Sequence, residues 1–96
     1  DACALAESCR REFAQAIGDC DLLLTAPTSG EAPLGLEATG NASLCILWTT
    51  LHVPAITIPA FRGPNGLPFG AQLIGRHHRD RALLSAARWA MRVLAA

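Results

Sequence analysis

Two short apolar segments in the second half of the chain, separated by turn residues, have the pattern of a β-hairpin. Residues 55–58 (AITI) are mostly β-branched and stand between Pro54 and Pro59. Because proline has no N–H to donate to a sheet, we expect these prolines to limit the first strand. Residues 69–74 give the second strand, and GPNG at 63–66 supplies the turn. The pattern predicts two antiparallel strands that need cover from other elements, because an isolated hairpin is only marginally stable.

Residues 1–17 have the periodicity of an amphipathic helix. Apolar side chains recur at every fourth position, at Leu5, Cys9, Phe13 and Ile17, with charged residues between them. Gly18 follows directly, and glycine is the residue most often found just past the end of a helix. We therefore predict a helix that ends at Gly18 and buries one face.

Two further helices are predicted. Residues 43–52 are apolar nearly all round, which indicates a short buried helix with Asn41 or Ser43 as its N-cap. The last helix is expected to begin with Asp80 as its N-cap. Its expected buried face consists of Leu83, Leu84, Ala87, Met91 and Leu94.

The continuous apolar run of residues 22–25 indicates a strand buried on both faces, and such strands usually lie beside a parallel neighbour. The loop that follows, residues 26–42, holds three glycines and two prolines, so it is either a functional loop or a solvated connector. Strand, helix and strand would then form a right-handed crossover. The chain is predicted to be a single α/β domain, residues 1–96, with element order α-β-α-β-β-α. We expect a small mixed sheet of about three strands with flanking helices.

Composition limits the possible partners. The 96 residues are 51% hydrophobic, but no apolar run approaches the roughly 20 residues of a membrane span. Residues 1–50 carry a net charge of −5 and residues 51–96 carry +5, which favours contact between opposite halves or with a charged partner. All basic residues are arginine, with little aromatic interleaving, so a nucleic acid is not expected. We expect no membrane contact, and the absence of a targeting pattern suggests the cytoplasm.

The candidate chemical groups do not form a complete site. The four cysteines, Cys3, Cys9, Cys20 and Cys45, lack metal or disulfide spacing. We expect them to be reduced and buried as small hydrophobic groups. His77 and His78 are expected to point apart, His52 to be a partnered structural histidine, and no serine stands in a nucleophile motif. The residues alone predict no metal, no cofactor and no catalytic residue.

A longer pattern resembles a known family. Residues 21–60 (DLLLTAPTSGEAPLGLEATGNASLCILWTTLHVPAITIPA), then GPNGLPFGAQLIG at 63–75 and a final amphipathic helix, are similar to the C-terminal segment of the amidase signature family. These serine amide hydrolases include glutamyl-tRNA amidotransferase A subunits. The most specific part is the proline-bracketed strand, the GLP turn and the GxQLIG strand at fixed spacing. The resemblance implies a fragment of a larger fold, in which helices flank a large mixed sheet.

The resemblance also implies catalytic groups that this chain does not supply. The family uses a Ser, cis-Ser, Lys triad on a glycine- and serine-rich stretch N-terminal to the matched region, and this sequence has no Lys. It departs from the family pattern at Cys45, His52 and Phe61, where Asn, Gly and Gly are common. By resemblance, Leu44 and Trp48 lie near the acyl-binding side of the pocket and are the candidate substrate-binding residues. The alternative for Trp48 is that it is a core residue without a binding role.

Together these features predict the C-terminal part of an amidase, which transfers an acyl group from an amide to water through an acyl-enzyme. No activity is expected of this chain alone. The alternative is a non-catalytic amidase-like module for binding or assembly. Because neither residues 22–24 nor residues 55–58 carry a charge that would block edge pairing, we expect a homodimer or association with the missing N-terminal part of an amidase.

Overall fold

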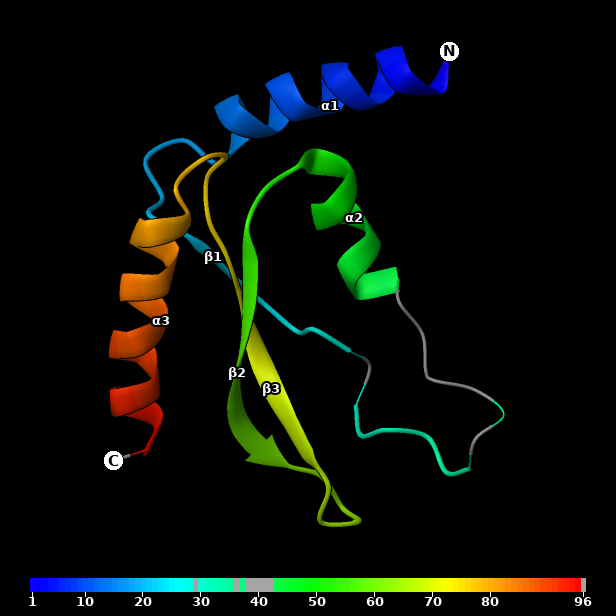
Figure 1. The fold of residues 1–96 in the computed structure, drawn as a ribbon, viewed down its shortest axis with the longest axis vertical. Coiled ribbons are helices and arrows are strands. Elements are labelled where there is room, and N and C mark those ends of the chain that lie inside the picture. The colour runs from blue at the N-terminus through cyan, green and yellow to red at the C-terminus, as the bar shows by residue number, and fades with distance from the viewer. Residues whose placement is uncertain (29, 36, 38–42, 96) are drawn as a thin grey trace.

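A computed structural model describes residues 1–28, 30–35, 37 and 43–95 (Figure 1). Its elements follow in the order α1 (Ala2–Ala16), β1 (Leu23–Thr25), α2 (Ser43–Leu51), β2 (Ala55–Arg62), β3 (Pro68–Ile74) and α3 (Asp80–Ala95). This order confirms the predicted α-β-α-β-β-α arrangement. The suggested N-cap Asn41 and part of the 26–42 loop lie outside the described residues. Within the described ranges, no helix is both long enough and apolar enough to cross a membrane.

The three strands form one antiparallel sheet in the order β1-β3-β2. β3 pairs with β1, so that Leu23 lies opposite Ile74, and it pairs with β2 on its other side. The predictions of a mixed sheet and of a parallel neighbour for β1 are therefore wrong. β1 is an edge strand, and its Leu24 is 70% exposed. The prediction failed because an apolar run does not show whether a strand is covered on one face or on both. The expected crossover joins β1 to β2, but β3 lies between them.

The hairpin of β2 and β3 has the predicted antiparallel pairing, but its first strand is longer than predicted. β2 continues through Pro59 to Arg62, with a β-bulge between Pro59 and Phe61 at this edge of the sheet. Gly70 lies opposite Pro59, and a Cβ atom on Gly70 would lie 2.4 Å from the carbonyl oxygen of Ile58. Only glycine therefore fits at this point of the hairpin.

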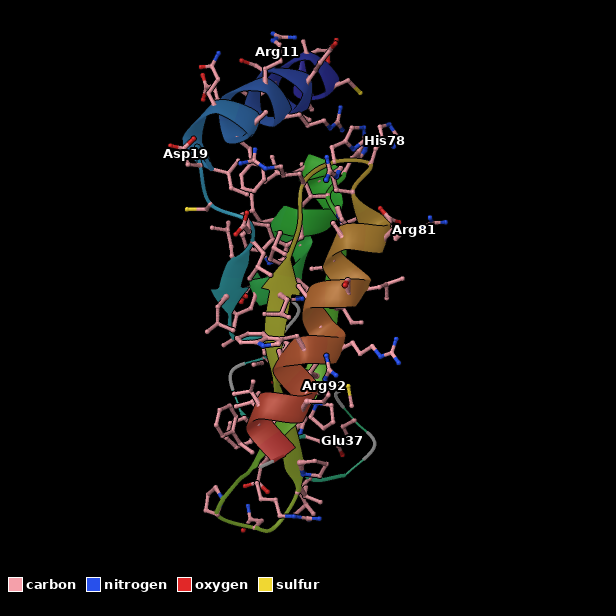
Figure 2. All side chains as sticks on the ribbon, turned by 90° about the vertical axis from the view of Figure 1, so that its left-hand side faces the viewer. Arg11, Asp19, Glu37, His78, Arg81 and Arg92 are labelled. Carbon is pink, nitrogen blue, oxygen red and sulfur yellow. The ribbon has the colours of Figure 1, made fainter. Side chains whose placement is uncertain are left out.

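α3 lies along the hairpin and forms the core with it (Figure 2). The buried core residues are Leu83 and Ala87 of α3, with Ile58, Ala71 and Leu73 of the sheet. The predicted apolar face of α3 was too wide, because Leu84, Met91 and Leu94 are exposed. Asp80 is the first residue of the helix rather than its N-cap.

α1 and α2 are helical as predicted but less buried than expected. α1 ends at Ala16 with Ile17 as its C-cap, and the chain then turns at Gly18, whose φ of 56° is the left-handed conformation expected after a helix. Of the predicted α1 face Ile17 is buried and Leu5 is exposed, while α2 buries Leu51 alone. The exposed apolar side chains of α2 are Leu44, Ile46 and Leu47. α1 crosses the end of the molecule opposite the hairpin turn, above α2 (Figure 1).

Candidate functional site

A buried polar cluster lies on the sheet face opposite α3. Gln72 is 5% exposed, and strand alternation directs it away from α3 because its neighbours Ala71 and Leu73 belong to the core. Its Oε1 accepts a hydrogen bond from Oγ1 of Thr25 at 3.1 Å, and its Nε2 lies 3.9 Å from Sγ of Cys45. The cluster therefore links the edge strand β1, the central strand β3 and α2.

The cluster also holds the start of the 26–42 loop. Cys45 donates from Sγ to the carbonyl oxygen of Pro27 at 3.0 Å, and Pro27 is itself buried. In the part of the chain that the structure describes, every buried side-chain nitrogen or oxygen has a hydrogen-bond partner. The sequence reasoning did not select Gln72. A glutamine in an apolar strand needs buried partners, and that signal could have identified it.

Leu44 and Trp48, the two predicted substrate-binding residues, lie one turn apart on α2. Nε1 of Trp48 donates to the carbonyl oxygen of Leu44 at 3.1 Å. The Trp48 ring packs edge-on against Phe13 of α1, with ring centroids 6.1 Å apart. Trp48 is half-buried and Leu44 is exposed, so both side chains keep surface that a ligand or another segment of a larger fold could cover.

The three histidines contact one another or their neighbours. The prediction that His77 and His78 point apart is wrong, because their ring centroids lie 3.7 Å apart. Nδ1 of His77 lies 2.6 Å from the carbonyl oxygen of His52 and so donates to it. Nε2 of His52 lies 3.0 Å from Nη2 of Arg10 and must accept, because arginine only donates. Among the described residues, no group of three His, Cys, Asp or Glu side chains could hold a metal ion.

The cysteines are free thiols, but the prediction that they are buried is wrong. Cys3, Cys9 and Cys20 are exposed, and Cys45 is half-buried. Two of the exposed thiols lie on α1, whose apolar face is left largely uncovered by the other described elements.

The loop between β1 and α2 is also attached to the hairpin turn. The Glu31 carboxylate accepts a hydrogen bond from the amide of Asn65 at 3.0 Å and another from the amide of Leu67 at 2.8 Å. A Cβ atom on Gly63 would lie 2.2 Å from the Glu31 side chain, so the turn leaves space for this carboxylate. The loop is therefore held at the polar cluster and at the far end of the hairpin.

Replacing Glu31 by alanine should loosen the hairpin turn, because two backbone amides lose their acceptor. For these solvent-exposed bonds we expect a loss of about 1 kcal/mol of local stability, which corresponds to roughly five-fold faster hydrogen exchange at Asn65 and Leu67. The matched control is Glu37→Ala, in the same loop (Figure 2), which should leave both rates unchanged. Unaltered exchange in Glu31→Ala would contradict the attachment.

Comparison with curated proteins identifies similar sequences, although no family model matches the chain. The mitochondrial glutamyl-tRNA(Gln) amidotransferase A subunit of Anopheles gambiae is 33% identical over 87 residues, covering 81% of this chain and 18% of the relative. The glutamyl-tRNA(Gln) amidotransferase A subunits of Sphingopyxis alaskensis and Alkaliphilus metalliredigens are 32% and 38% identical over 84 and 86 residues. These matches cover 79% and 81% of this chain and 17% of each relative.

A solved crystal structure of an amidase has a similar fold. It superposes with a TM-score of 0.83 at 28% sequence identity, over 98% of this chain and 24% of that chain. The matched region therefore extends over the elements from α1 to α3. This chain spans less than a fifth of the length of the curated relatives and about a quarter of the amidase structure.

Proposed function

Because this chain belongs to the amidase signature family, as one segment of its fold, we propose that it forms a substrate-facing part of an amide hydrolase. The observation that carries this proposal is the similarity to an amidase structure over 98% of the chain. In such an enzyme a serine accepts the acyl group of the amide, and water then releases it. This sequence has no lysine, so the Ser, cis-Ser, Lys triad of the family would have to come from outside residues 1–96. Within the enzyme we propose that residues 1–96 form a single domain.

Within that enzyme, Leu44 and Trp48 would line the acyl side of the pocket. Both lie on α2 and keep exposed surface, and a half-buried aromatic residue beside an aliphatic one suits the apolar part of an acyl group. The contacts of Gln72 with Thr25 and Cys45 support this role, since they hold α2 and β1 to the central strand. Gln72 is thus a positioning residue.

We expect the purified chain to hydrolyse no simple amide above background. The reason is that the lysine of the triad is missing from it, and no other nucleophile with a base was found in the sequence. The measurement is amide hydrolysis together with labelling by a fluorophosphonate probe. Labelling of any serine that an amide substrate blocks would overturn this expectation.

The same proposal predicts activity when the missing part is supplied. In a chimera, this chain would replace the matching segment of the Alkaliphilus metalliredigens relative, which is 38% identical to it. The chimera should hydrolyse an amide, whereas the relative with that segment deleted should not. A folded chimera that is no more active than the deletion would argue against the proposed function.

A second candidate function, assembly without catalysis, is supported by the open edges of the sheet. β1 and β2 are both outer strands, and Leu24 on β1 is exposed. Exposed strand edges pair readily with another chain, and the opposite charges of the two halves suit a two-fold contact. A homodimer is the form of assembly that we propose.

Light scattering at micromolar concentration should therefore give twice the 10.1 kDa chain mass. Leu24→Lys should shift the protein toward the monomer, because a charge on an edge strand opposes pairing. Leu34→Lys, at a fully exposed residue of the loop between β1 and α2, is the matched control and should leave the dimer intact. A stable species at the chain mass for the unmodified protein, with a thermal transition independent of concentration, would exclude the dimer.

The cytoplasm is the compartment that we propose for either function. Three exposed free thiols on a small chain suit a reducing environment, in which they stay unpaired.

A further inference from the structure

A cavity of about 270 Å³ lies where α1 crosses the end of α2 and the link between β3 and α3. This volume is close to the lower limit of small-ligand pockets, which measure roughly 300 to 1,000 Å³. The cavity is separate from the site described above, because Leu44, Trp48 and Gln72 do not line it. Much of its lining comes from α1, which crosses the end of the molecule opposite the hairpin turn (Figure 1).

The floor of the cavity is apolar and firmly held. It is formed by Phe13, Ile17, Leu51 and Val53. Ile17 and Leu51 are 4% and 5% exposed, and Phe13 is held in place by its ring contact with Trp48. An apolar floor of this kind favours a ligand that has an apolar body.

The polar side chains that line the cavity are mostly cationic. The lining contains Arg10, Arg11 and Arg76 and one acidic residue, Glu7, so its formal charge is +2 with His77 counted as neutral. The charge of Arg11 is only weakly balanced, because its contact with Glu7 measures 3.7 Å and both side chains are about two-thirds exposed.

The other two arginines are fixed in position by neutral groups. Nε of Arg10 donates to the carbonyl oxygen of Thr50 at 3.0 Å. Nη2 of Arg76 donates to the carbonyl oxygens of Gly18 and Cys20, the latter at 3.0 Å. Among the described residues neither Arg10 nor Arg76 forms an ion pair. Their guanidinium groups are therefore oriented while their positive charge stays unneutralised.

We propose that this cavity binds a small carboxylic acid whose body is a short apolar or aryl group. A carboxylate matches the planar donors of a guanidinium, and the apolar body would fill the floor. Inorganic phosphate would leave the floor empty, and a neutral apolar molecule would leave the net positive charge of the lining unbalanced. The proposal stands on the cavity alone and is independent of amide hydrolysis.

The test uses 3-phenylpropionate as the probe and the purified chain as the receptor. Calorimetry should give a dissociation constant at or below about 1 mM, which rises with salt concentration. The amide resonances of α1, Leu51 and His77 should shift on binding. The neutral 3-phenylpropan-1-ol and inorganic phosphate should each bind at least about ten-fold more weakly than the acid.

Arg11 is the arginine to substitute in this test. Arg10 is less suitable, because it also bonds α1 to the carbonyl of Thr50 and its substitution would disturb the fold. Arg11→Gln should weaken the binding of 3-phenylpropionate roughly three- to ten-fold and leave the thermal unfolding transition unchanged. Arg92→Gln is the matched control, since Arg92 lies on α3 far from α1 (Figure 2), and it should bind like the unmodified chain. No binding of the acid, equal binding of the alcohol, tighter binding of phosphate, or full affinity in Arg11→Gln would each overturn the proposal.

Discussion

Replacing Leu83 by alanine should lower the free energy of unfolding by about 2 to 5 kcal/mol. Leu83 is 4% exposed and packs against Ile58, Ala71 and Leu73 at the centre of the core. Truncation removes apolar contacts and leaves a cavity that the sheet cannot fill. Because small domains are stabilised by only about 5 to 15 kcal/mol, a loss of this size would leave much of the protein unfolded on mild heating.

The adjacent leucine gives a matched control for this experiment. Leu84 is 59% exposed, so Leu84→Ala should change the free energy of unfolding by less than about 0.5 kcal/mol. Urea denaturation of the two variants, followed by circular dichroism, measures both values. Equal losses at Leu83 and Leu84 would show that both leucines are covered in solution, and would contradict the packing of α3.

Gly70→Ala should destabilise the protein by about 1 to 3 kcal/mol, the range for overpacking a well-packed site. The added Cβ would lie 2.4 Å from the carbonyl oxygen of Ile58 and 2.6 Å from Cγ2 of Thr57. Since the nearer atom belongs to the backbone of β2, the two strands would have to separate at the bulge. Thermal denaturation measures the loss.

A double variant separates the two contacts of the added Cβ. Thr57→Ala removes the Cγ2 atom but leaves the carbonyl of Ile58 in place. Combining Thr57→Ala with Gly70→Ala should therefore restore only a small part of the lost stability. Full recovery would show that side-chain crowding, rather than the approach of the two backbones, excludes a larger residue.

The sequence was sufficient to predict the order of elements, because each has a local signal. The turn residues at 63–66 identified the hairpin, Gly18 marked the end of α1, and the apolar periodicity of α3 identified the last helix. What failed was the extent of burial. Leu24, Leu84 and the exposed face of α2 are apolar without being covered by the described chain. A hydrophobic pattern shows which surfaces need cover but not whether this chain provides it.

The candidate site was less predictable, since its contacts join residues far apart in sequence. Gln72 meets Thr25 and Cys45, and the cationic cavity joins α1 to Arg76. No local spacing encodes such contacts. Leu44 and Trp48 were selected by family resemblance, and the structure shows that Nε1 of Trp48 donates to the carbonyl oxygen of Leu44.

The position of β3 between β1 and β2 sets the order in which the chain can acquire its structure. Residues 55–95 contain a complete hairpin and the helix that covers it, so this part has mainly local contacts and should form first. β1 is synthesised earlier, yet its neighbour in the sheet, Ile74 opposite Leu23, emerges from the ribosome about 50 residues later. We therefore expect β1 to join the sheet only after β3 has been made, and until then the apolar segment at 22–24 would stay exposed and open to aggregation.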